Sequence, residues 1–148
     1  MFPNSKPSER SALLATYDPA SVAASTVLTA WVPVKNIHTL MAVLQTGVMG
    51  ASGTIDAKLR QATDNAGTGA KDITGKSITQ IVKASGDNKQ AIINMKTADL
   101  DTENGFAFVA LSITVGTAAS LLSAQLWGCD PRFMDAAGLN QAGVVQVV

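Results

Sequence analysis

The chain has few charged side chains for its 148 residues. Only 15% of the residues are charged, against roughly 25% in an average globular domain, whereas 47% are hydrophobic. This composition is too apolar for a disordered chain, and it is unusually low in charge for the surface of a free monomer. It suits a single domain whose polar surface is built from Thr, Ser, Asn and Gln and is partly covered by neighbouring subunits.

An excess of charge of either sign is also missing. Eleven Lys and Arg balance eleven Asp and Glu, so the formal net charge at pH 7 is zero. Without a basic stripe to neutralise phosphates, we expect no nucleic-acid partner. No run approaches the roughly 18 consecutive apolar residues of a transmembrane helix, so we expect no membrane partner. The first ten residues, MFPNSKPSER, contain two prolines and mixed charges where a signal peptide needs an apolar core, which predicts synthesis in the cytoplasm.

The chain contains one cysteine and one histidine. Cys129 has no internal partner for a disulfide, and a cysteine-based zinc site is excluded. A Ser-His-Asp triad would depend wholly on His38, which lies in an apolar run without a nucleophile motif nearby. Cys129 next to Asp130 lacks the electropositive setting that activates a thiol. We therefore expect no enzyme, no metal site, no cofactor and no small-molecule substrate.

Two further groups of residues permit a functional or a structural interpretation. Asp99, Asp101 and Glu103 could gather around calcium, but they lack the spacing of an EF-hand loop and are more simply part of a polar turn. Trp31 and Trp127 could form a platform on which sugars stack. Because both lie at the ends of expected strands, packing against the core is the alternative role.

The stretch GTGAKDITGKS ends in Gly75-Lys76-Ser77, the last three residues of a phosphate-binding P-loop. Ala70 occupies the position where the motif needs its first glycine. The segment that follows, SITQIVKAS, has β alternation instead of the helix whose N-terminus would hold the phosphates. We predict a long loop between two strands, with Lys76 in solvent.

From Ser25 onward, the chain consists of short β-like runs separated by Gly, Asn and Asp. In TIDAKLRQAT, the apolar Ile55 and Leu59 alternate with the charged Asp56 and Arg60, as in a strand with one face in solvent. IHTLMAVLQT and FAFVALSITV are apolar on both sides and are predicted to be central strands. The other expected strands are STVLTAW, SITQIVKAS, QAIINMKT and SLLSAQLWG. This series predicts an all-β fold, an antiparallel β-sandwich or jelly-roll-like domain.

Extended arms are expected on both sides of this domain. Three prolines interrupt residues 1–22, the predicted N-terminal arm, and residues 23–128 form the predicted β-sandwich. The predicted C-terminal arm, residues 129–148, ends in VVQVV, which suits a strand added to an edge of its own sheet or of a neighbour's. The candidate partner contacts are the apolar residues of the two arms: Phe2, Leu13, Leu14, Val144, Val145, Val147 and Val148.

Two long segments, AWVPVKNIHTLMAVLQTGVMGASGTIDAKLRQATDNAGTGAKDI and ADLDTENGFAFVALSITVGTAASLLSAQLWGCDPRF, carry a family resemblance. Between about Trp31 and Phe133, the chain resembles a group of small virion structural proteins of tailed bacteriophages. The likeness is one of overall pattern, and it transfers no functional residues. It implies a capsid decoration or cement protein, which is small, mostly β, and sits where capsomers meet, often with arms that tie neighbours together.

Composition, arms and resemblance together predict a bacteriophage virion structural protein that stabilises the head by contacts between subunits. The expected partners are the major capsid protein and copies of the chain itself, in a homo-oligomer such as a trimer. The expected location is the capsid surface of the virion, after synthesis in the host cytoplasm. Two alternatives stay open. One is a neck or tail component, such as a head–tail connector or minor tail protein, and the other is a jelly-roll carbohydrate-binding module.

Overall fold

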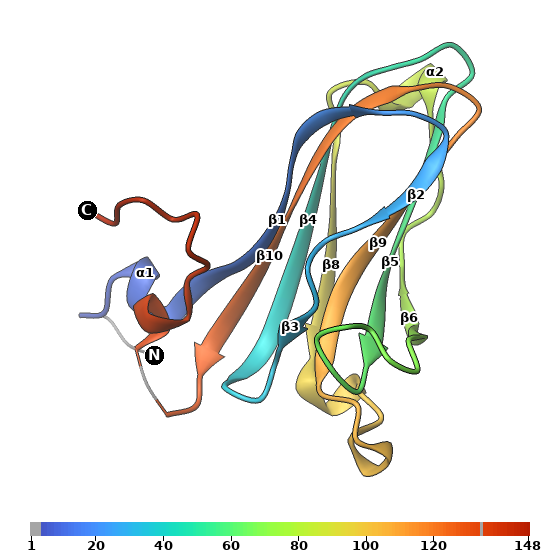
Figure 1. Ribbon diagram of the computed structural model, residues 1–148. Helices are drawn as coiled ribbons and strands as arrows, with labels where there is room; N and C mark the ends of the chain where they lie inside the picture. The colour runs from blue at the N-terminus through green and yellow to red at the C-terminus, as the bar shows by residue number, and fades with distance from the viewer. Residues whose placement is uncertain (1–3, 134) are drawn as a thin grey trace.

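Two antiparallel β-sheets face each other in the computed structural model, which describes residues 4–133 and 135–148 (Figure 1). The first, sheet A, has four strands in the order β1 (Ser11–Val22), β10 (Ser120–Pro131), β4 (Ile37–Met49) and β8 (Gln90–Lys96). The second, sheet B, has the order β2 (Ser25–Leu28), β9 (Phe108–Gly116), β5 (Thr54–Ala62) and β6 (Lys71–Ser77). Two short strands complete sheet B: β3 (Val32–Pro33) pairs with β9, and β7 (Ile81–Val82) pairs with β5.

The connections follow a jelly-roll topology. The chain crosses between the sheets after β1, β3, β4, β7, β8 and β9, and the first and last strands are neighbours in sheet A. Because β2 and β3 both pair with β9, and β6 and β7 flank the other side of β5, each pair acts as one interrupted strand. The result is two sheets of four, the eight-stranded arrangement of a double-sheet jelly roll. The all-β fold expected from the sequence is confirmed.

The core lies between the sheets and is filled by the side chains that alternate inward along each strand. Ile55 and Leu59 of β5 are fully buried, as are Leu111 and Ile113 of β9. The outward neighbours of these β5 residues, such as Asp56, are only partly buried. The period-2 pattern therefore predicted the inward face correctly, because successive side chains of a strand point to opposite sides of the sheet.

The predicted N-terminal arm was too long. Residues 11–22 form β1, which pairs with β10 and buries Ala12 and Ala15, so of the described residues in this part of the chain only 4–10 lie outside the sheets. Pro19 is tolerated because β1 is an edge strand and its register with β10 shifts between Tyr17 and Ala20. At the other end, residues 129–131 still belong to β10, so the C-terminal arm begins at residue 132 and not at 129.

The predicted strand SITQIVKAS was also wrong. Ser77 ends β6, which instead covers the charged stretch from Lys71. Residues 78–80 form a connection, and the residues after them divide between β7 and the short helix α2 (Lys83–Gly86). A charged stretch can pair here because β6 lies at the edge of sheet B, where its side chains reach solvent. Gly75 has a φ of 73°, and the register between β5 and β6 shifts in this region, so the strand is bulged.

The remaining elements are single turns: α1 (Pro7–Arg10), η1 (Thr97–Asp99), η2 (Thr102–Asn104) and η3 (Ala136–Leu139). Among the described residues, no helix has the length and apolar character needed to cross a membrane.

A buried hydroxyl fixes the loop that leads into β8. Thr46 is 1% exposed, and its Oγ1 donates to the carbonyl of Gly86 and accepts from the backbone N–H of Lys89 at 3.0 Å. The backbone N–H of Thr46 also donates to the carbonyl of Lys89 at 2.8 Å. One residue of β4 therefore sets where β8 starts.

Replacing Thr46 with Val should lower the free energy of unfolding by about 1–3 kcal/mol, because the buried Gly86 carbonyl loses its donor. The measurement is urea unfolding followed by circular dichroism. Thr26→Val is the matched control, since it removes an exposed hydroxyl that bonds Thr114, and it should change stability by less than about 0.5 kcal/mol. Equal effects of the two substitutions would contradict this assignment.

Candidate interaction surfaces

The outward-facing side chains of sheet A form an apolar surface, here called the outer face of sheet A. Strand pairing aligns Leu13 of β1, Trp127 of β10 and Met41 of β4 in one row across the sheet. In the adjacent row, Val43 of β4 lies beside Ile92 of β8. Ile92 is 57% exposed and the others are partly buried. The other members of these two rows are polar but uncharged: Thr16, Asn94 and Gln125.

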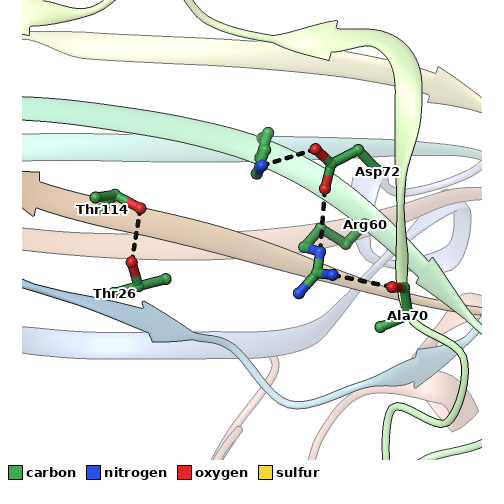
Figure 2. Close-up of polar contacts among 6 residues, drawn as sticks. Thr26, Arg60, Ala70, Asp72 and Thr114 are labelled. Atoms are coloured by element: carbon green, nitrogen blue, oxygen red, sulfur yellow. Dashed lines mark hydrogen bonds and ion pairs between the residues drawn. The ribbon is translucent and has the colours of Figure 1, made fainter.

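The outward face of sheet B is charged, and its charges are paired with one another. Asp72 of β6 accepts from Lys58 Nζ at 2.7 Å and from Arg60 Nε at 3.1 Å, both on β5. Figure 2 shows Arg60 between Asp72 and the carbonyl of Ala70, to which it donates at 3.0 Å. The two outer faces therefore differ: on sheet B, Lys58, Arg60 and Asp72 pair with one another, whereas the two rows described on sheet A are uncharged and largely apolar, with Lys96 beyond them at the end of β8.

Hydrogen bonds and ion pairs lower the pKa values of five aspartates. A hydrogen bond from Lys58, assisted by the charges of Lys58 and Arg60, holds the pKa of Asp72 below its ordinary value of 3.8. The pKa of Asp101 is lowered chiefly by a hydrogen bond from Lys71, and that of Asp87 by one from Lys83. Hydrogen bonds to Thr68 and to the backbone of Lys96 lower the pKa of Asp64 and of Asp99 in the same direction.

The end of the chain, residues 140–148 (the C-terminal segment), is attached to the edge of β1. The backbone N–H of Leu13 donates to Asn140 Oδ1 at 2.8 Å, and the N–H of Gln141 donates to the carbonyl of Leu13 at 2.8 Å. Figure 1 shows the segment beside α1, near the start of β1. Val144 and Val147 line a hollow of about 360 Å³ together with Leu13 and Trp127.

Beyond this attachment, the C-terminal segment is exposed. Val145 and Val148 are both 98% exposed, and Val147 is 51% exposed. The segment forms no strand, so its own sheets do not take up VVQVV as an added strand in this structure.

The predicted partner contacts fall into different environments. Leu13 belongs to the outer face of sheet A, whereas Leu14 packs partly against the core. Phe2 lies outside the described residues. Contact of Leu13, Leu14 and the four valines with a partner stays a prediction. Sequence reasoning missed Met41, Val43 and Ile92. Their alternation with buried residues can be seen in the sequence, but only the order of the strands shows that they form one surface.

The last three residues of the P-loop-like stretch lie within a strand. Gly75, Lys76 and Ser77 belong to β6, and Lys76 Nζ lies 3.0 Å from Asp99 Oδ2. The expectation of a loop with Lys76 in solvent was therefore wrong, because β6 brings the lysine next to η1. Asp101 in turn pairs with Lys71, so each of the two aspartates considered for calcium faces a lysine. Within residues 4–133 and 135–148, no group of three or more potential metal ligands is present.

The remaining candidates are separated. His38 is exposed near the start of β4, in a hollow with Glu9, Arg10 and Asp130, while Cys129 is partly buried on β10. Trp31 lies just before β3 of sheet B, outside the strand, whereas Trp127 is on sheet A and donates its Nε1–H to Gln125 at 2.8 Å. The two tryptophans do not form a common platform.

No protein-family model and no curated protein sequence matches the chain. Among solved structures, a chain from the naturally occurring empty particles (top component) of Cowpea mosaic virus is 10% identical, with a TM-score of 0.42 over 88% of this chain and 91% of that one. The SPBc2 prophage-derived protein YomS is also 10% identical, with a TM-score of 0.43 over 80% of this chain and 93% of that one.

A carbohydrate-binding module specific for non-crystalline cellulose, CBM28, is 8% identical, with a TM-score of 0.47 over 81% of this chain and 74% of that one. All three TM-scores are below 0.5, and the jelly-roll topology given above comes from the strand pairing of the chain itself.

The lowered pKa values predict that acid destabilises the fold. A carboxyl group whose pKa is lower in the folded state stabilises the fold above its unfolded pKa, and this contribution is lost as the pH falls through the lowered value. The melting temperature should therefore drop between about pH 5 and about pH 2. Asp72→Asn should reduce this drop while costing only about 0–1 kcal/mol at pH 7, since the Asp72 side chain is 51% exposed. Calorimetry across this pH range tests it, with the exposed Glu103→Gln as control. An unchanged acid dependence in Asp72→Asn would contradict the assignment.

Proposed function

We propose that the chain is a structural protein of a bacteriophage virion that decorates the capsid and stabilises the head through contacts between subunits. Its partners are the major capsid protein and copies of itself. The residue pattern from about Trp31 to Phe133, which resembles small virion proteins of tailed phages, supports the phage assignment. The proposal gives the chain a mechanical role and assigns it no reaction and no cofactor.

The observation that carries the proposal is the apolar surface that the chain leaves uncovered. Val145 and Val148 are almost fully in solvent, and Phe133, at the start of the same arm, is 85% exposed. The outer face of sheet A adds Ile92 and Val43. Surface of this kind on a chain with little charge is typical of a subunit that is covered in its assembly.

The energetic argument depends on repetition. Burial of apolar area contributes about 25 cal/mol per Å², so one short apolar segment gives a weak contact. On a shell, each copy is held by several such contacts at once, and the second contact forms at the high effective concentration set by the first. Many weak contacts of this kind can hold neighbouring capsomers together.

Copy number per purified particle is the test of this function. A decoration protein should be present at on the order of hundreds of copies, whereas a ring in the neck or tail holds about six or twelve. Quantitative mass spectrometry of purified virions, with the major capsid protein as internal standard, gives this number. A count near six or twelve would replace the decoration role with a neck or tail role, and absence from particles would refute a virion role altogether.

The C-terminal segment should be required for attachment but not for folding. Deletion of residues 142–148 keeps Asn140 and Gln141, whose hydrogen bonds to β1 remain, so the circular dichroism spectrum and melting temperature should be nearly unchanged. Occupancy of particles by the deleted protein should fall at least about tenfold, which corresponds to about 1.4 kcal/mol of lost binding. Re-addition of purified protein to particles that lack it measures this occupancy.

The matched control is Val48→Thr, which alters another exposed valine, 56% exposed, near the opposite end of β4 from Met41. It should decorate particles as the unmodified protein does. Full occupancy by the deletion variant would show that the C-terminal segment is not a tether.

A further inference from the structure

Three of the four edges of the two sheets are blocked or irregular. The free side of β1 is occupied at Leu13 by Asn140 and Gln141, and its register with β10 shifts twice. In sheet B, β6 is bulged and charged, and β2 spans only Ser25–Leu28 before the chain reaches Pro33 of β3. Short strands, bulges, charges and prolines are the features by which proteins prevent other strands from adding to an edge.

The fourth edge, β8, has none of these features. It pairs with β4 without a register shift, and its middle, from Gln90 to Met95, contains no charge, no proline and no glycine. The hydrogen bond from Thr46 N–H to the Lys89 carbonyl sets the phase of this ladder. By alternation, Ala91, Ile93 and Met95 direct their backbone groups toward β4.

The backbone groups of the intervening residues therefore point away from the sheet. By the same alternation, the backbone N–H of Lys96 points away from β4, and it donates to Asp99 Oδ2 at 2.8 Å. No hydrogen bond among the described residues engages the outward N–H or C=O groups of Ile92 and Asn94. These groups are an unused template for one more strand, next to an isoleucine side chain that is 57% exposed.

The segment Val144-Val145-Gln146-Val147-Val148 has the composition of such a strand. It is uncharged, like the middle of β8, and valine is among the residues that most favour strands. With a period of two, Val145 and Val147 share one face, and Gln146 lies on the other. Placed beside β8, the two valines would extend the inward row of Ile93 and Met95, and the glutamine would extend the outward row of Asn94.

The segment cannot reach β8 of its own chain while Gln141 remains bonded to Leu13. The sheet order β1-β10-β4-β8 puts five strand spacings of about 4.8 Å, or about 24 Å, between the position of Gln141 and a strand added beyond β8. From Gln141 to Val144, the chain covers at most about 11 Å. The β8 edge within reach is therefore that of another copy.

We infer that residues 144–148 of one copy add as an edge strand to β8 of a second copy. The inference rests on the proposed function, since it names the partner surface for the C-terminal segment. Main-chain hydrogen bonds to Ile92 and Asn94 supply the affinity, and the valine face supplies the register. Because the donor segment and the acceptor edge are different surfaces, the contact is heterologous, and it can repeat from copy to copy.

Complementary variants test the contact by sedimentation of the purified full chain at up to about 1 mM. At this concentration, about 40% of the contacts are formed if their Kd is about 1 mM. Asn94→Pro removes an outward N–H and leaves the ladder to β4 intact, while Asn94→Ala is its matched control. Ile92→Lys places a charge at the same edge and is a second acceptor variant if the proline destabilises the fold. The donor variant is V145K/V147K, and thermal melting checks that each protein is folded.

The unmodified chain and Asn94→Ala should associate in a concentration-dependent way, whereas each acceptor variant and the donor variant should be monomeric, with affinity weakened at least tenfold. An acceptor variant keeps its own C-terminal segment, and the donor variant keeps its own β8 edge. Mixing the two should therefore restore one contact and give a one-to-one dimer that grows no further.

Three outcomes would overturn the inference. The unmodified chain could stay monomeric at about 1 mM, the acceptor variants could associate normally, or the donor variant could associate while the acceptor variants do not, which would indicate β8–β8 pairing instead. The virion role is tested separately by copy number. High copy number together with normal association of the acceptor variants would leave the proposed function standing and remove only this contact.

Discussion

The pairing of β1 with β10 is the contact on which the arrangement of this molecule depends. It joins the first long strand to the last, so the chain enters β1 and leaves β10 at the same end of sheet A, beside the β1 edge. Asn140 and Gln141 then meet Leu13 across this edge, although 127 residues separate Asn140 from Leu13. As a result, the apolar end of the chain lies on one side of sheet A, and the regular, open edge of β8 lies on the other.

The two sheets use their outward faces differently. Sheet B carries Lys58 and Arg60 on β5, which both pair with Asp72 on β6. In exposed positions such pairs add little stability, but they keep a surface soluble and resist contact with other apolar surfaces. Sheet A presents Trp127, Met41 and their neighbours without charge. This asymmetry gives the molecule one face suited to solvent and one suited to a neighbour.

Local alternation was enough to predict the strands that bury one face cleanly or two faces fully. β5 and β9 were read correctly because their side chains report a period of two whatever they pair with. β1 was taken for part of an arm because of Pro19, and only its place at an edge, with a register shift beside the proline, explains how it pairs. β6 was missed because charged residues form a strand only where an edge lets them reach solvent.

The predicted contact residues show the same limit. The exposed valines at the end of the chain were evident from composition, because nothing within VVQVV supplies charge. Leu13 and Leu14 are adjacent in sequence, yet Leu13 is on the outer face of sheet A and Leu14 packs partly against the core. Which of two adjacent residues faces outward depends on the register with β10, which shifts between Leu13 and Ala15.

By itself, the sequence determined that this is an all-β chain with little charge and an apolar, strand-forming end, since those properties follow from residue type and spacing alone. Tertiary structure decided which strands are neighbours, where the chain ends are held, and that Ile92 and Asn94 direct their backbone groups outward. These features depend on hydrogen bonds between residues far apart in the chain. No local pattern encodes the phase of a ladder whose partner strand is tens of residues away.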